Sequence, residues 1–276
     1  MRLIKPEGST IVDSMATDVD GRDIAHMAAL ASRYDDLVTK DYAVFHTYHV
    51  EPYLDRLVQR LPQGTLLDVG CGTAVVGLAA ASRGLDVVGI DHTQEMLDVA
   101  IRKAKELGLA ERTRFQVGDA TAMPFPDSSF DAVVCQRMLH HLPDMRPCLQ
   151  EISRVLKPGG SFYIADSCRD VTPVKSTLIN LKRSVVRKHS LSRLTDEAEE
   201  ELPELLSEDE WPVSGEELVS TIADVGLEKD SLLFLTSLGY RSYLSESMTW
   251  NLIRLLSFPW RRSKGEMVFV TGTKPA

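Results

Sequence analysis

Three acidic residues lie at or just beyond the ends of predicted strands. Asp68, Asp91 and Asp119 each accompany a short apolar run that is typical of a buried strand. Because the carboxyl ends of parallel strands meet along one edge of an open sheet, we expect these carboxylates to line one crevice. Such a crevice suits hydroxyl groups, an amino group or a cation better than it suits phosphates.

A glycine-rich turn separates the first two of these acids. Gly70, Cys71 and Gly72 follow an apolar run and precede a stretch of small residues that predicts a helix. Glycines permit a tight turn and let a ligand approach the free N–H groups at the start of a helix. Asp91 comes about 20 residues after Gly70, the spacing at which a doubly wound nucleotide-binding fold places a carboxylate on ribose hydroxyls.

Strand and helix patterns alternate through the middle of the chain, which predicts an α/β fold with parallel strands and helices on both faces. Strands are expected at 65–69, 86–90, 113–117, 132–135, 161–165, 229–236 and 266–271, and helices at 74–82, 94–107, 145–156 and from 214 to about 226. The residues predicted to cap helices at their N-termini are Thr93, Asp144 and Ser214, the last in a Ser-x-x-Glu capping box.

The rest of the chain predicts additions around this core. We expect a flexible tail over 1–22, a helical cap over 23–62, the ligand-binding core over 63–166, an inserted helical lid over 167–213, and the C-terminal part of the core over 214–276 with an inserted helix at 245–260. In the cap, Tyr34 or Arg33 could reach the polar end of a ligand. The lid joins a basic amphipathic stretch to an acidic one, and we expect these halves to face each other or solvent, with a membrane or an anionic substrate as the alternative.

Composition limits the class of protein. The chain has 276 residues, of which 43% are hydrophobic and 26% charged, as in ordinary soluble proteins. It shows no apolar run long enough to span a membrane and no signal-peptide pattern, and its four cysteines form no Cys-x-x-Cys pair, so we expect a cytoplasmic protein without a metal site or disulfides. The net charge of −9 is concentrated in the acidic stretch at 195–210. The sequence lacks the basic face that is expected of a protein that binds nucleic acid.

Five motifs, in chain order, resemble those of class I S-adenosylmethionine-dependent methyltransferases, in particular the branch with ubiquinone, menaquinone and other small-molecule enzymes. They are Asp68–Thr73, Gly89–Asp91, Gly118–Phe125, Leu139–Asp144 and Arg154–Gly160. The resemblance covers residues 65–166, and the remainder is matched only loosely. It implies a Rossmann-like, doubly wound, seven-stranded and mostly parallel sheet. One departure is Ala74, which stands where the family has a third glycine, and we expect it to cause modest crowding.

The resemblance implies S-adenosylmethionine as cofactor and S-adenosylhomocysteine as product. The backbone of Gly70, Cys71 and Gly72 would pass close to the methionine part of the cofactor. Asp68 would lie under that turn, bound directly or ordering it, and Asp91 would accept the ribose hydroxyls.

The same resemblance assigns the far end of the cofactor. His92 and Met96 would pack on the adenine, Asp119 would accept its amino group, and Ala120 would offer a backbone contact. Gln136 would face the methionine end and the acceptor.

His140 and His141 are the candidate general bases for a hydroxyl acceptor. Because this His-His-Leu-Pro-Asp stretch recurs in relatives with different chemistry, we expect at least one of the two to have a structural role. We predict a methyltransferase that acts on an oxygen or nitrogen of a small molecule, in biosynthesis or natural-product tailoring.

Several alternatives stay open. The protein could bind the cofactor without catalysis, as a regulator or assembly partner, or could methylate a lipid, a quinone or a peptide. The Gly-x-Gly-x-Ala pattern and Asp119 argue against a third alternative, a nicotinamide-dependent dehydrogenase. A methyltransferase that acts on amino groups of nucleic acids would carry an Asn/Asp-Pro-Pro-aromatic motif after the fourth strand, and residues 135–138 do not match it. A metal-assisted enzyme would need clustered carboxylates after the same strand, and the sequence shows no such cluster. The sequence leaves open whether the chain forms a homodimer.

Overall fold

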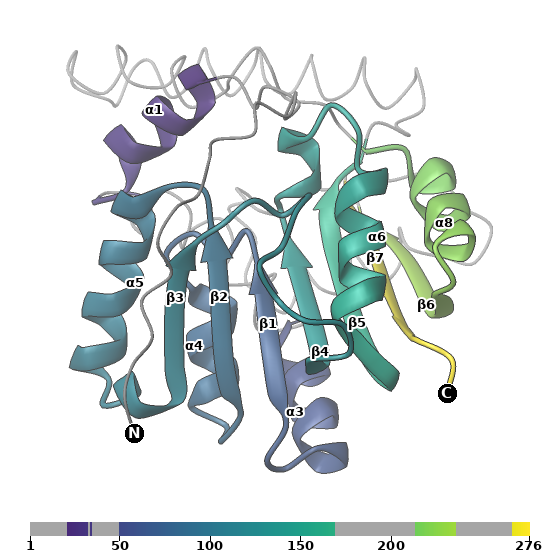
Figure 1. Cartoon of the computed structure of the whole chain (residues 1–276), viewed down its shortest axis with the longest axis horizontal. Coiled ribbons are helices and arrows are strands. Elements are labelled where there is room, and N and C mark those ends of the chain that lie inside the picture. The colour runs from purple at the N-terminus through teal and green to yellow at the C-terminus, as the bar shows by residue number, and fades with distance from the viewer. Residues whose placement is uncertain (1–20, 33, 35–49, 169–212, 236–266) are drawn as a thin grey trace, which may run out of the picture.

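A seven-stranded sheet forms the centre of the computed structural model, which describes residues 21–32, 34, 50–168, 213–235 and 267–276 (Figure 1). The strand order is β3-β2-β1-β4-β5-β7-β6. The strands are β1 (Thr65–Val69), β2 (Asp86–Asp91), β3 (Thr113–Val117), β4 (Phe130–Gln136), β5 (Leu156–Ser167), β6 (Glu228–Leu235) and β7 (Met267–Thr273). The pairs among β1 to β5 are parallel, whereas β7 runs antiparallel to both β5 and β6.

Helices cover both faces of the sheet. The helices of the described residues are α1 (Gly21–Leu30), α3 (Glu51–Arg60), α4 (Val75–Ala81), α5 (Gln94–Glu106), α6 (Arg146–Val155) and α8 (Gly215–Asp224), with short 3₁₀ turns η2 (Ala110–Arg112) and η3 (Leu139–His141), and all of the α-helices except α1 lie against the sheet. α3 and α4 bury their apolar residues against one face, and α5 packs beside α4. α6 and α8 cover the other face. Alternate residues of each central strand therefore enter different core clusters, which is why these strands are apolar throughout.

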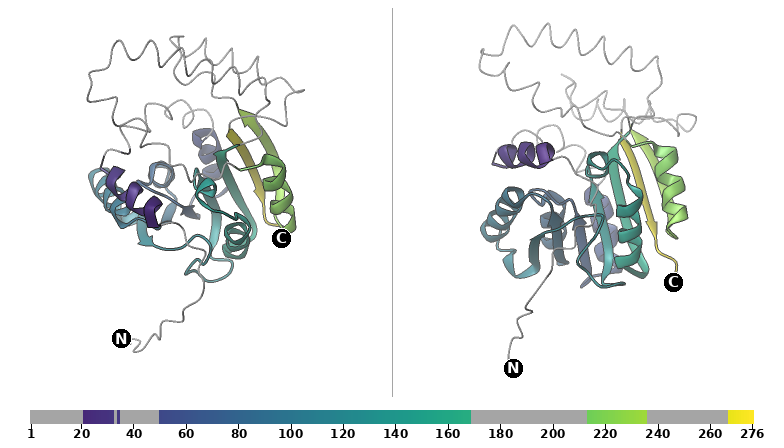
Figure 2. Two further views of the ribbon diagram at one scale, coloured as in Figure 1. Left: turned by 90° about the horizontal axis from the view of Figure 1, so that it is seen from above. Right: turned by 45° about the horizontal axis from the view of Figure 1, so that its top comes forward.

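The helix α1 packs on α5 rather than on the sheet. Ala31, Met96 and Val99 are buried together, with Met27 and Tyr34 packed against them. Figure 1 shows α1 above the edge toward which the arrows of the parallel strands point, and Figure 2 confirms that it lies at the opposite end of the molecule from α8. α1 thus borders the edge of the sheet where the predicted site lies.

The predicted α/β architecture, with a mostly parallel seven-stranded sheet, is confirmed. Ser214 caps α8 by accepting a hydrogen bond from the N–H of Glu217 (3.4 Å), as predicted. The predicted N-cap of α6 is wrong by one residue, because Met145 occupies that position. Asp144 still serves the helix end, since its Oδ1 accepts from the N–H of Arg146 (2.8 Å).

Several predictions concern residues outside the described ranges. These are the tail up to residue 20, Arg33, the part of the cap at 35–49, nearly all of the lid, and the inserted helix at 245–260.

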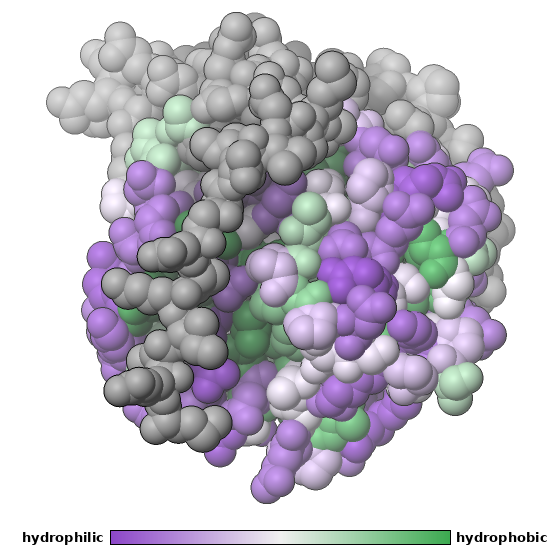
Figure 3. Space-filling model, in the orientation of Figure 1, coloured by the Kyte–Doolittle hydropathy of each residue, from purple (hydrophilic) through white to green (hydrophobic). Residues whose placement is uncertain are grey.

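On the face seen in Figure 3, hydrophilic residues predominate and hydrophobic ones are interspersed among them. No helix in the described ranges combines the length and the apolar character needed to cross a membrane.

Candidate functional site

The glycine-rich turn leaves β1 through left-handed backbone. φ is +64° at Gly70, +50° at Gly72 and +59° at Ala74. A Cβ atom on Gly70 would overlap Cγ of Met138, whereas one on Gly72 would meet no heavy atom of the described residues within 4 Å. Gly70 is therefore required by a close neighbour, and Gly72 faces open space in which a ligand could approach the backbone.

Asp91 shapes this turn from the end of β2. Its Oδ2 accepts from the N–H of Gly72 (2.8 Å) and its Oδ1 from the N–H of Thr93 (2.9 Å). Since a carboxylate has about four acceptor positions, both oxygens retain capacity for hydroxyl donors. The structure thus places Asp91, the residue predicted to bind the ribose, directly beside the turn that was predicted to hold the methionine part of the cofactor.

Asp68 lies beneath the turn and points toward α4. Its Oδ2 accepts from the N–H of Gly77 (2.9 Å), and the side chain is buried. Burial raises the pKa of Asp68 to about 7, against the opposing effect of the Gly77 hydrogen bond. Of the two roles considered for Asp68, ordering the turn is the one that its contacts support.

Cys71 also faces inward. Its side chain is buried, and a Cβ atom on Gly89 would lie 2.8 Å from its Sγ. Burial raises the pKa of this thiol, so it stays neutral. Only the backbone of Cys71 is available to the crevice. From α5, Nζ of Lys103 donates to the carbonyl oxygen of Thr73 (2.9 Å) and fixes the far side of the turn.

Asp119 and His92 meet where β3 and β2 end. The Nε2 atom of His92 lies 3.6 Å from Oδ1 of Asp119, which also accepts from N and Oγ1 of Thr121, both at 2.7 Å. Burial opposes ionisation of Asp119, but the Thr121 hydrogen bonds and His92 outweigh it and lower the pKa. Ala120, the next residue, is buried in the core.

The other predicted cofactor residues are placed less directly. Met96 is buried against α1, in the cluster that includes Tyr34, so these two residues lie together at the α1–α5 contact. Gln136 ends β4, and its Oε1 is buried with no hydrogen-bond partner among the described residues. A buried acceptor of this kind is satisfied when a bound ligand donates to it.

His140 is held by a buried carboxylate. Its Nδ1 lies 2.6 Å from Oδ1 of Asp166, and both side chains are almost fully buried. Oδ2 of Asp166 accepts from the N–H groups of Met138 (3.1 Å) and Leu139 (2.7 Å). Burial would raise the pKa of Asp166, but the charge and hydrogen bond of His140 and the N–H of Ser167 outweigh it and lower the pKa.

His141 is half-buried and stacks on its neighbour, with ring centroids 4.1 Å apart. The sequence interpretation singled out both histidines but gave Asp166 no role in the site. Asp166 lies at the end of β5, so the rule that identified the other strand-end acids would also have found it.

The residues present fit S-adenosylmethionine. Gly72 offers bare backbone in open space, Gln136 a buried acceptor without a partner, and Asp91 and Asp119 carboxylates for hydroxyl and amino donors. Among the described residues no group of three or more His, Cys, Asp or Glu side chains is placed to hold a metal ion.

Known proteins resemble this chain over the same region. Residues 67–164 match a family model described as a methyltransferase domain. The uncharacterised methyltransferase YcgJ of Bacillus subtilis (strain 168) is 40% identical over 132 residues, which cover 46% of this chain and 52% of YcgJ. The ubiquinone biosynthesis O-methyltransferase of Pectobacterium carotovorum is 32% identical over 158 residues, which cover 56% of this chain and 64% of that protein.

The chain therefore spans about half to two thirds of the length of these relatives. The crystal structure of YcgJ superposes with a TM-score of 0.52 and 24% identity over 81% of this chain and 98% of YcgJ, which shows the shared fold. The matched residues contain the glycine-rich turn and the strand-end acids Asp68, Asp91 and Asp119, whereas Asp166 lies just beyond them. The chain carries a class I, S-adenosylmethionine-dependent methyltransferase domain.

Proposed function

We propose that this protein transfers a methyl group from S-adenosylmethionine to a small-molecule acceptor through oxygen or nitrogen, with oxygen favoured, in a biosynthetic or tailoring reaction. The observation that carries the choice of oxygen is the 2.6 Å hydrogen bond between His140 and Asp166. A hydroxyl must lose its proton when it attacks, whereas a neutral amine can attack before it does so.

The pair fixes the orientation of the imidazole ring. The lowered pKa of Asp166 keeps it ionised and therefore acceptor-only, so Nδ1 of His140 carries the shared proton. Nε2 is then the basic nitrogen, and the carboxylate stabilises the imidazolium that forms when it takes a proton. His140 is 1% exposed, so this proton transfer would take place away from bulk water.

The loop that holds His140 also contacts the glycine-rich turn. Met138 packs on Gly70, and its N–H is bound by the same carboxylate that holds His140. Asp166 therefore orients the histidine and fixes the loop against the turn assigned to the methionine end. When bound, the cofactor would supply a sulfonium methyl whose leaving group is a neutral thioether, so the main task of these residues is alignment.

The acceptor is the part of this proposal that depends on relatives. One of the relatives described above is an O-methyltransferase of ubiquinone biosynthesis, which supports a hydroxyl acceptor and keeps a quinone precursor among the candidates. Binding of the cofactor without catalysis is the competing function.

Methyl transfer from labelled S-adenosylmethionine to a panel of phenols, sugars, aliphatic alcohols and amines tests the proposal. We expect a phenol or alcohol to gain one methyl group, and His140→Asn to lower kcat by about a hundredfold or more, the usual contribution of a general base. His141→Asn is the matched control and should retain more activity. Transfer to amines alone, or full activity of His140→Asn, would contradict the choice of oxygen. Cofactor binding without transfer to any acceptor would favour the non-catalytic function.

A further inference from the structure

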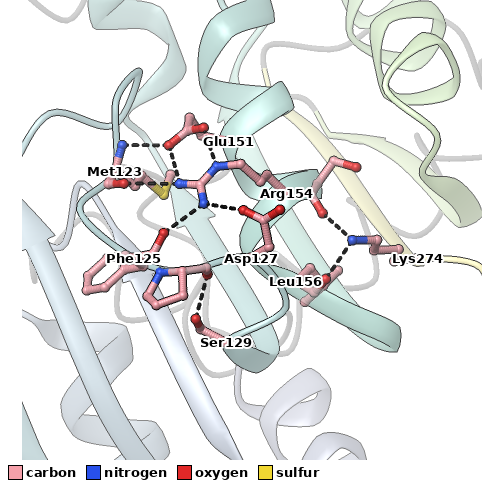
Figure 4. Close-up of polar contacts among 10 residues, drawn as sticks. Met123, Phe125, Asp127, Ser129, Glu151, Arg154, Leu156 and Lys274 are labelled. Carbon is pink, nitrogen blue, oxygen red and sulfur yellow. Dashed lines mark hydrogen bonds and ion pairs between the residues drawn. The ribbon is translucent and has the colours of Figure 1, made fainter.

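The guanidinium group of Arg154 uses all five of its N–H donors within the described residues (Figure 4). Nε and Nη2 donate to the two carboxylate oxygens of Glu151, both at 2.7 Å. Nη1 donates to the carbonyl oxygen of Phe125 (2.7 Å) and to Oδ1 of Asp127 (2.8 Å), and Nη2 also donates to the carbonyl oxygen of Met123 (3.0 Å). One side chain of α6 therefore binds the loop after β3 at three residues.

Met123 is bound at both of its backbone groups. Its N–H donates to Oε2 of Glu151 (2.6 Å), while its carbonyl oxygen accepts from Arg154. Glu151 and Arg154 together satisfy this residue as a neighbouring β-strand would. The loop residue is thus fixed to a helix in a place where the sheet offers it no partner.

Met123 lies close in sequence to the residues assigned to the adenine. Asp119 accepts from the N–H of Ala122 through its carbonyl oxygen (3.1 Å), and Asp119 and Ala120 directly precede this turn. Ala120 and Met123 are buried in the same core cluster as the apolar face of α6. A shift of Met123 would therefore be transmitted to Asp119.

The exposure of the network argues against a role in stability alone. The Arg154 side chain is 31% exposed and that of Asp127 is 77% exposed. Ion pairs as exposed as Arg154–Asp127 contribute little to folding. What distinguishes this network is that the rigid, planar guanidinium group of Arg154 binds backbone carbonyl oxygens of one loop, which fixes the backbone conformation of that loop.

We propose that Glu151 and Arg154 are positioning residues that hold loop residues 119–123 in the shape that binds the adenine base of S-adenosylmethionine. This inference rests on the proposed use of that cofactor. Lysine would keep the charge of Arg154 but cannot reproduce five directed donors. The pair thus acts through Asp119 and Ala120.

Isothermal titration of the 276-residue chain with two nucleosides tests this role. S-adenosylhomocysteine carries the adenine amino group, and S-inosylhomocysteine has an oxygen in its place. We expect Arg154→Lys to weaken binding of S-adenosylhomocysteine about tenfold, the value of one well-placed hydrogen bond, and to change binding of S-inosylhomocysteine little.

Lys274→Met is the matched control. Nζ of Lys274 donates to the carbonyl oxygens of Ser153 (2.8 Å) and Leu156 (2.9 Å) at the end of the same helix, away from the loop (Figure 4). This variant should leave the affinities for both nucleosides unchanged. If Arg154→Lys does not fold, Glu151→Gln is expected to cause a smaller loss that is again selective for S-adenosylhomocysteine.

Three results would overturn the inference. They are unchanged binding of S-adenosylhomocysteine by Arg154→Lys, equal losses for the two nucleosides, and an equal loss in Lys274→Met. Wild-type protein that is folded but binds no S-adenosylhomocysteine would instead refute the cofactor assignment, and the inference with it.

Discussion

The aspartates at the carboxyl edge of the sheet differ in how many hydrogen bonds they accept. Asp68 is buried and accepts one backbone hydrogen bond, and its pKa is raised. Asp166 is also buried, but it accepts from three N–H groups and from His140, and its pKa is lowered. Residues of one type at equivalent ends of strands therefore have opposite protonation preferences, because the charge and hydrogen bond of His140 outweigh burial at Asp166, whereas no such partner opposes burial at Asp68.

Asp68 makes the free energy of unfolding depend on pH. In the unfolded chain its pKa takes the ordinary value of 3.8, and in the folded protein it is about 7. Between these values the folded state holds one more proton, so the free energy of unfolding falls as pH rises through this window, by up to about 1.4 kcal/mol per pH unit, and changes no further above it.

Asp68→Asn should abolish this part of the pH dependence. The unfolding free energy of wild type relative to Asp68→Asn is expected to fall by about 2 kcal/mol between about pH 5 and about pH 7. Urea unfolding of the two proteins across this range measures the difference, in which all other titrating groups cancel. A difference that stays constant with pH would show that Asp68 is ionised throughout.

At the scale of elements, the glycine-rich turn was predicted correctly from its residues, whereas its exact backbone could not be. Gly70 and Gly72 were expected to allow a tight turn, and both have positive φ. Ala74 and Arg137 also have positive φ, which their residue types do not indicate. These conformations are imposed by tertiary contacts, such as the hydrogen bond from the N–H of Arg137 to the carbonyl oxygen of Ala165 (2.8 Å).

The two glycines should respond differently to alanine. Gly72→Ala has open space for its methyl group, so only the backbone strain of about 1–2 kcal/mol is expected. Gly70→Ala adds an overlap with Met138 and should cost about 1–3 kcal/mol more. Urea unfolding gives these values.

Gly72→Ala is expected to be the more stable of the two variants but to lose affinity for the cofactor. The methyl group of Gly72→Ala enters the space assigned to the cofactor, so this more stable variant should bind S-adenosylhomocysteine at least tenfold more weakly than wild type. Normal binding by Gly72→Ala, or a greater loss of stability than in Gly70→Ala, would contradict the geometry of the turn.

At the scale of the whole molecule, the order of strands and helices followed from the alternation of apolar patterns, and the motif set pointed to the family. The contacts that complete the site join residues far apart in sequence, such as His140 with Asp166 and Met123 with Arg154. Such pairs depend on which strand ends and helix faces become neighbours, and local patterns do not specify that. The sequence therefore suggested His140 as a candidate without its partner, and Asp119 without the residues that hold its loop.

The central claim is that the glycine-rich turn and the aspartates at the strand ends beside it bind S-adenosylmethionine. Asp91 would accept two ribose hydroxyls, and loss of these charge-assisted hydrogen bonds should cost about 2–3 kcal/mol, or tenfold and more in affinity. Asp86→Ala is the matched control, because Asp86 begins the same strand and is exposed beside Arg112 at the opposite edge.

Calorimetric titration of S-adenosylmethionine and S-adenosylhomocysteine into wild type, Asp91→Ala and Asp86→Ala is the most direct measurement. The account predicts that wild type and Asp86→Ala bind both compounds and that Asp91→Ala loses at least tenfold in affinity. Folded wild type that binds neither compound, or Asp91→Ala that binds as tightly as wild type, would contradict it.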